Sequence, residues 1–175
     1  MSTSGAVIMT FFATVWWVVG VHLARPSSLP LYAAGAAITG AIVFMAFRRP
    51  APRSSEGERS RQGRLVGIAS GAEGLLIFVV ANILGNIGRT DLIASAVAII
   101  VGLHFSPLAW KLPAPLYFTT GTALLFLGIA GCFVQQTHVT SWAICLAAAS
   151  ILWITSALVL SNNSTRSETP PGLAA

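Results

Sequence analysis

The chain has 175 residues, of which 55% are hydrophobic and 9% charged, and its mean hydropathy is +0.78. Soluble domains carry about 25% charged residues, so this composition excludes an ordinary soluble domain. It also excludes a disordered chain, and the two cysteines exclude a disulfide scaffold. The net charge of +5 does not indicate nucleic acid as a partner, because most basic residues lie in one short stretch between apolar segments.

Six apolar segments are long enough to cross a bilayer, each close to the roughly 20 residues that a transmembrane helix needs. Their continuous hydrophobicity, without alternation, favours helices over the strands of a membrane barrel. The first segment is interpreted as a retained helix, because no positive charge precedes it as in a signal peptide. The sequence therefore predicts an all-α polytopic bundle, one domain over residues 1–161, with helices at 5–23, 31–47, 65–88, 92–110, 116–134 and 141–160 arranged as three hairpins.

Two polar segments flank these helices. Residues 48–64 are predicted to form an irregular basic loop that lies against anionic lipid headgroups, and residues 162–175 a flexible tail. A dedicated protein or phosphoinositide site in the loop is the alternative. Because positive residues stay cytoplasmic, this loop and both termini are predicted on the cytoplasmic side of the cell (inner or plasma) membrane. The predicted headgroup contacts are Arg48, Arg49, Arg53, Arg59, Arg61 and Arg64.

Small residues at helical spacing predict where helices contact one another, because transmembrane helices associate through close packing. Such small-residue faces occur in four segments, formed by Ala33, Ala37 and Ala41; by Gly67, Gly71, Gly74, Gly85 and Gly88; by Gly121, Gly128 and Gly131; and by Ala143 and Ala147.

In segment 92–110, Pro107 predicts a kink, with a gating hinge as the alternative.

Glu73 is the one acidic residue predicted to lie within the hydrocarbon. Ionised there, it would cost at least about 2.5–3.5 kcal/mol, so we expect it to be protonated, paired or solvated. His104 lies at the same predicted depth, about 12 Å from the cytoplasmic side, on the next antiparallel helix. Three interpretations remain open, namely a contact with His104, a bond elsewhere in the bundle, and a shallower solvated position. Asn82 and Asn86 complete the candidate intramembrane polar site.

Other polar residues predict little chemistry. Arg89 and Asp91 should pair in a turn at the outer surface. Cys132 and Cys145 fall at similar depth, so that a disulfide and two apolar packing residues are alternatives. The sequence lacks the motifs of metalloproteases, α/β-hydrolases and P-loop proteins, and we expect no enzyme, no catalytic residue, no metal site and no cofactor.

Residues 102–109 read Gly-Leu-His-Phe-Ser-Pro-Leu-Ala, and Pro-Leu-Tyr-Phe follows at 115–118 with Thr-Gly at 120–121. Together with residues 82–91, this pattern resembles a family of small bacterial multi-pass membrane proteins whose function is uncharacterised. The resemblance implies the six-helix architecture and a bacterial origin, and it implies that His104 and Pro107 belong to the family's motif. It supplies no activity.

Two functions are consistent with these residues. One is a small permease with Glu73 and His104 near its path. The other is a partner subunit, sensor or stabilising protein whose buried polar residues only hold the bundle together. Both imply the lipid bilayer as a partner, and the second also implies a homo-oligomer or a second membrane subunit. A six-helix bundle does not decide between them, since such bundles host many functions.

Overall fold

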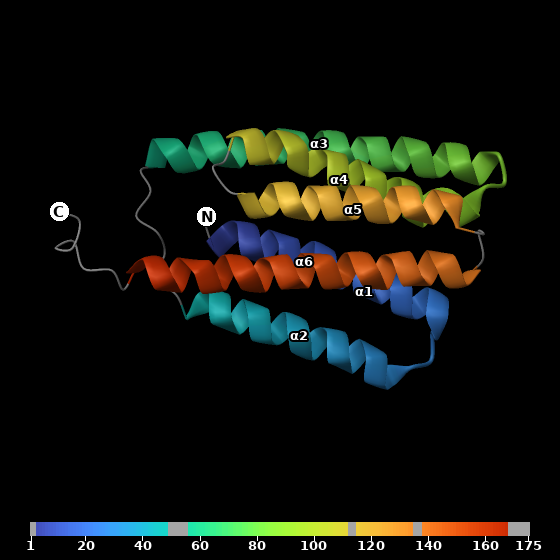
Figure 1. Cartoon of the computed structure of the whole chain (residues 1–175), viewed down its shortest axis with the longest axis horizontal. Coiled ribbons are helices and arrows are strands. Elements are labelled where there is room, and N and C mark those ends of the chain that lie inside the picture. The colour runs from blue at the N-terminus through green and yellow to red at the C-terminus, as the bar shows by residue number, and fades with distance from the viewer. Residues whose placement is uncertain (1–2, 49–55, 112–114, 135–137, 168–175) are drawn as a thin grey trace.

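The computed structural model describes residues 3–48, 56–111, 115–134 and 138–167. In this part of the chain the regular structure is helical and no strand occurs. The helices run along the long axis of the molecule, and α1 begins at the end of the bundle where α6 ends (Figure 1). The elements are α1 (Thr3–Ala24), α2 (Leu29–Phe47), α3 (Glu56–Asn86), the short 3₁₀ helix η1 (Thr90–Leu92), α4 (Ile93–Lys111), α5 (Pro115–Phe133) and α6 (His138–Ser167).

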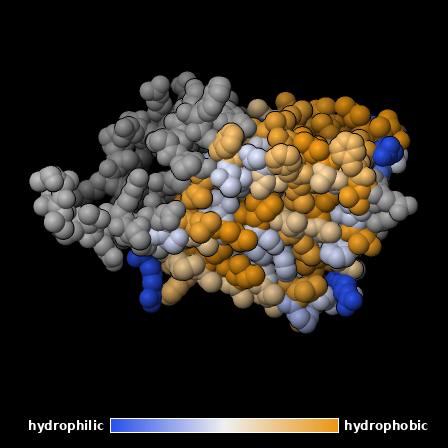
Figure 2. Space-filling view, viewed as in Figure 1, coloured by the Kyte–Doolittle hydropathy of each residue, from blue (hydrophilic) through white to orange (hydrophobic). Residues whose placement is uncertain are grey.

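Four of these helices are long and apolar enough to cross a membrane by length and composition, namely α1, α2, α5 and α6. In the other two helices, the apolar stretches within the described residues are Ser70–Asn86 in α3 and Thr90–Phe105 in η1 and α4. The surface agrees with this assignment, because on the face shown in Figure 2 the area between the two ends of the bundle is mostly apolar. The all-helical fold of six long helices predicted from the sequence is therefore confirmed, and four of these helices are compatible with spanning a membrane.

The predicted helix ends hold for most elements, with two differences. The first is in the basic segment, where residues 48–64 were expected to be irregular but α3 already begins at Glu56. Residues 56–64 are rich in Glu, Arg and Gln, which favour helices, and the acidic residues lie in the first turn, where the helix dipole stabilises them. The second is in the predicted tail, because α6 continues to Ser167.

The bundle is built around two closely packed helix pairs, α1 with α6 and α4 with α5. Ala13 of α1 is wholly buried, and so are Ala148 and Leu152 of α6. All three belong to the hydrophobic core of the bundle. The predicted face on α6 is displaced, since Ala143 and Ala147 are half-buried while Ala148 and Ala149 are completely buried. α2 packs against α1 and α6, and α3 packs against α4 and η1.

Backbone contact between α4 and α5 depends on glycines of both helices. A Cβ atom on Gly128 would lie 2.6 Å from the carbonyl oxygen of Ser95, and one on Gly102 would lie 2.6 Å from the backbone nitrogen of Leu125. On Gly121 it would lie 2.8 Å from the carbonyl oxygen of Gly102. No side chain fits at these distances, so the prediction that the glycines of residues 116–134 mark a close contact is confirmed.

The predicted contact faces of α2 and α3 point outward instead. Added Cβ atoms on Gly67, Gly71, Gly74 and Gly85 would meet no neighbouring atom of the described residues within 4 Å, and the same is true of Gly88, which follows α3. On α2, Ala33, Ala37 and Ala41 are exposed. The prediction that these faces pack within the chain is therefore wrong. Helical periodicity groups the small residues on one side of a helix, but it does not say which side the rest of the chain covers.

α2 is held instead by larger residues of α1. The Trp17 ring fills the space that a side chain on Gly35 would take, and its indole N–H donates to the carbonyl of Leu31 at 2.9 Å. Further along the pair, the hydroxyls of Thr14 and Thr39 form a hydrogen bond of 2.8 Å. Within apolar helices, such hydroxyl bonds contribute about 1 kcal/mol each.

The glycine contacts predict that replacing glycine by alanine has different effects on stability at two positions. Gly128→Ala should destabilise the protein by about 1–3 kcal/mol, because the new methyl group overlaps the α4 backbone. Gly74→Ala, the matched control, should be neutral or stabilise the protein by up to about 1 kcal/mol, because it meets open space and improves helix propensity. Unfolding in detergent micelles followed by circular dichroism measures both. Equal effects of the two substitutions would contradict this account of the α4–α5 contact.

Candidate functional site

Glu73 and His104 meet across the interface between α3 and α4. The His104 Nδ1 atom lies 3.6 Å from the Glu73 Oε2 atom, and the side chains are 13% and 10% exposed, respectively. Of the three interpretations left open by the sequence, the contact between these two residues is the one that the structure contains. The distance is that of an ion pair, slightly beyond the range of a direct hydrogen bond.

The pairing follows from the hairpin that joins the two helices. Glu73 precedes Gly88 by 15 residues, and His104 follows it by 16. Because helices rise by about 1.5 Å per residue, nearly equal separations from a tight turn place two residues at the same depth. Glu73 also points away from the open glycine side of α3, where Gly71 and Gly74 meet no neighbour, and toward α4.

The α4 side of the site is held by aromatic packing. The ring of His104 lies edge-on to Phe105, with 6.1 Å between ring centroids. Phe105 stacks in turn on Tyr117 of α5 at 5.9 Å, and both of these residues are buried. Two residues before His104, Gly102 touches the α5 backbone. The position of His104 is therefore fixed by the α4–α5 contact, whereas Glu73 reaches the site from α3 alone.

The charge of the pair depends on how many protons it holds. With one proton between the carboxyl and the imidazole, the pair is neutral overall, either as acid and base or as two opposite charges. With two protons it carries a net positive charge, and with none a net negative charge. Because a net charge in an apolar environment is costly, the one-proton form is the one that this site favours. Such an arrangement can hold and release a proton.

The two other residues of the candidate polar site do not join the pair. Asn82 is exposed, and its side-chain nitrogen donates to the carbonyl of Phe78 in its own helix at 2.7 Å. Asn86 is also exposed, in the last turn of α3. Both lie nearer the Gly88 turn than Glu73 does, so the structure separates these amides from the carboxyl and the imidazole.

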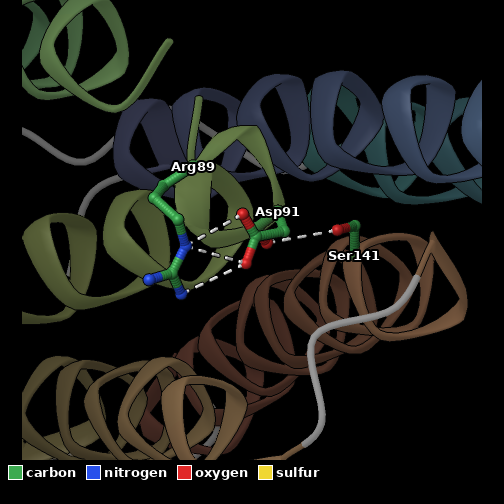
Figure 3. Close-up of polar contacts among 3 residues, drawn as sticks. All are labelled: Arg89, Asp91 and Ser141. Carbon is green, nitrogen blue, oxygen red and sulfur yellow. Dashed lines mark hydrogen bonds and ion pairs between the residues drawn. The ribbon is translucent and has the colours of Figure 1, made fainter. Parts of the chain in front are cut away.

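Just after the end of α3, at the Gly88 turn, the predicted pair of Arg89 and Asp91 is present. The guanidinium of Arg89 donates to the carboxylate of Asp91 at 3.3–3.4 Å. The Ser141 hydroxyl donates to the backbone carbonyl of Asp91 at 3.4 Å, which connects η1 to the first turns of α6 (Figure 3). This end of the α3–α4 hairpin is thereby attached to the rest of the bundle.

Several polar contacts were missed by the sequence analysis. The buried hydroxyls of Thr120 and Thr155 form a hydrogen bond of 2.8 Å between α5 and α6. Each hydroxyl also lies within hydrogen-bond distance of the carbonyl four residues earlier, so one threonine donates to its partner while the other donates to its own helix. A threonine within a transmembrane segment is therefore the signal that could have pointed to this contact. Ser95 Oγ and Trp153 Nε1 are buried without a hydrogen-bond partner among the described residues.

The remaining candidates have separate positions. Arg48 is exposed at the end of α2, with its guanidinium 4.4 Å from the centre of the Phe44 ring. Cys132 is exposed and Cys145 buried, and both are free thiols, so the disulfide alternative is wrong. α4 continues past Pro107 to Lys111. The following lie outside the described residues, either entirely or in their side chains: Arg49, Arg53, Arg59, Arg61, Arg64 and Pro107.

An apolar groove of about 430 Å³ lies between α1 and α2, away from the Glu73–His104 pair. Its threonine hydroxyls already have partners, because Thr10 bonds to the carbonyl of Ala6 and Thr14 bonds to Thr39. The described residues contain no group of three or more His, Cys, Asp or Glu that could hold a metal ion. The Glu73–His104 pair is therefore the contact in the described structure that brings two ionisable side chains together inside the bundle.

No protein-family model, curated protein or solved structure matches the chain. The resemblance of residues 102–121 to a bacterial membrane-protein family stays a prediction.

The contact at the site predicts that its two residues are energetically coupled. A double-mutant cycle with Glu73→Gln and His104→Gln should give a coupling energy of about 0.6–1.7 kcal/mol, as measured for side-chain pairs between transmembrane helices. Combining Glu73→Gln with Asn82→Ala is the control, because these side chains do not touch, and the two effects should add within about 0.5 kcal/mol. Additive effects of the first pair, measured by unfolding in micelles, would contradict the contact.

Proposed function

We propose that this protein is a small proton-linked permease of the bacterial cell membrane, in which Glu73 and His104 bind the proton. The observation that supports the proposal is the contact itself, since a carboxyl and an imidazole lie 3.6 Å apart inside a bundle with an apolar surface. Ionisable residues within membrane bundles are costly, and they commonly mark proton relays or transport pathways. Imidazole suits this role because its proton affinity lies near neutral pH.

The proton would reach the pair from the end of the bundle where α1 begins. Glu73 lies three residues after Ser70, where the described apolar stretch of α3 begins, and 15 residues before Gly88 at the other end. By the distribution of Lys and Arg in the sequence, this end is the cytoplasmic one, where the basic residues of the segment before Glu73 would contact anionic lipid headgroups. The described part of that contact surface is Arg48.

A second candidate function is that of a membrane partner subunit. The outward-facing small residues of α2 and α3 favour it, because small residues let another helix approach closely. In that case the Glu73–His104 contact would serve only to attach α3 to α4. The two functions differ in one measurable property, since a permease needs a carboxyl that exchanges protons with water and a structural contact does not.

Infrared spectroscopy of the protein in lipid bilayers tests the proposal without a known substrate. We expect a protonated carboxyl band that Glu73→Gln removes and that titrates between about pH 5 and pH 8. His104→Gln, which leaves the carboxyl in place, should keep the band but change the pH range of its titration. A spectrum with no Glu73 band that changes over this range would overturn the proton-binding role and favour the partner subunit.

A further inference from the structure

We infer that α3 is a hinged arm, which pivots at the Gly88 turn and is clasped to α4 by the Glu73–His104 contact when that pair holds one proton. The inference rests on the proposed proton site and assigns to it a conformational consequence. Three features support it, namely the packing of α3 on one side, the turn at its end, and the position of the ionisable contact far from that turn.

Packing holds α3 mainly along one side. Its partners are α4 and η1, whereas α4 is locked to α5 by backbone contact at Gly102, Gly121 and Gly128. α3 lies at the edge of the bundle in Figure 1. On its free side, Leu75 is 66% exposed and Phe78 65% exposed. Among the described residues, displacing α3 would therefore break fewer contacts than displacing α4, which would also break the backbone contact with α5.

The turn at the end of α3 has the properties of a pivot. Gly88 has a φ of +74°, a left-handed conformation that glycine adopts without strain. The backbone N–H of Arg89 caps α3 by donating to the carbonyl of Leu84 at 2.8 Å, so the helix stays intact up to the turn. Beyond the turn, the Asp91 carbonyl is attached to Ser141 of α6. A rigid helix thus meets an anchored segment at Gly88.

The Glu73–His104 contact, here called the clasp, lies far from the Gly88 turn, so a small rotation of α3 about that turn moves Glu73 a long way. Fifteen residues separate Glu73 from Gly88, which corresponds to about 22 Å of helix. A rotation of about 10° over that length moves the Glu73 backbone by about 4 Å. Such a displacement would separate the two side chains, which are 3.6 Å apart in the structure.

The number of protons on the Glu73–His104 pair sets its net charge, and this charge determines how strongly the pair holds α3 against α4. Of the groups on the elements packed against α3, His104 of α4 faces Glu73, while Arg89 and Asp91 pair with each other near the pivot. Tyr117 of α5 stacks on Phe105. The pair is neutral with one proton, so α3 is closed at intermediate pH. Either net charge favours access to water and an open arm, at the acid end with two protons and at the alkaline end with none.

Distances between spin labels test this mechanism. In a background with Cys132→Ser and Cys145→Ala, labels at Leu75→Cys on α3 and Phe118→Cys on α5 report the arm. Both residues are largely exposed, so the labels do not disturb packing. Labels at Phe44→Cys on α2 and Phe118→Cys form the control pair, whose distance should stay constant and show that the bundle remains folded. Leu75 lies 13 residues before Gly88, so a rotation of about 10° should shift the α3–α5 distance by about 3 Å at both pH extremes.

Two variants of the clasp separate the acid and alkaline responses. Glu73→Gln cannot become negative, so its arm should open at acid pH and stay closed at alkaline pH. His104→Gln cannot become positive, so its arm should open at alkaline pH only. The double variant stays neutral and should show no pH response.

A constant α3–α5 distance in the protein without clasp substitutions would overturn the inference, and so would an unchanged pH response in the double variant. The infrared result is independent of this one. A titrating Glu73 band with an immobile α3 overturns the arm but leaves the proton site in place. A moving α3 without a titrating Glu73 band overturns both the proton site and the clasp.

Discussion

Backbone contact between α4 and α5 is the interaction on which the arrangement of this bundle depends. Lipid tails are as apolar as leucine, so burial of apolar side chains alone does not bring transmembrane helices together. Close approach does, and here it requires glycines at Gly102, Gly121 and Gly128. The same contact fixes the position of His104. The ionisable ring of His104 is thus held at a defined position by packing that involves no charge.

The threonines described inside the bundle follow a second rule, that a hydroxyl is satisfied within its own helix or by one neighbouring helix. Threonine hydroxyls bond to the carbonyl four residues earlier, and two pairs, Thr14–Thr39 and Thr120–Thr155, also join helices. In these bonds the threonine hydroxyls already have their hydrogen-bond partners. The Glu73–His104 contact differs because its groups can change charge, which is why a function is assigned to it and not to the threonines.

The number of helices, their antiparallel order and the matching level of Glu73 and His104 along the α3–α4 hairpin could be predicted from the sequence, because a fixed rise per residue and a short turn determine them. Which face of a helix is covered could not. Gly67 and Gly128 have the same local signal, yet the first meets open space and the second touches a backbone. That difference depends on how all six helices are arranged. The helical start of α3 at Glu56 was missed because charge and glycine suggested a loop, although most of the residues favour a helix.

Glu73 has a consequence for how the chain enters the membrane during synthesis. It is the one charged residue in the described apolar stretch of α3, Ser70–Asn86. An isolated helix with a carboxylate inserts at a cost of about 2.5–3.5 kcal/mol, which pairing with a histidine reduces. We therefore expect α3 to insert stably only after α4 has been translated, so that the two helices enter as a hairpin.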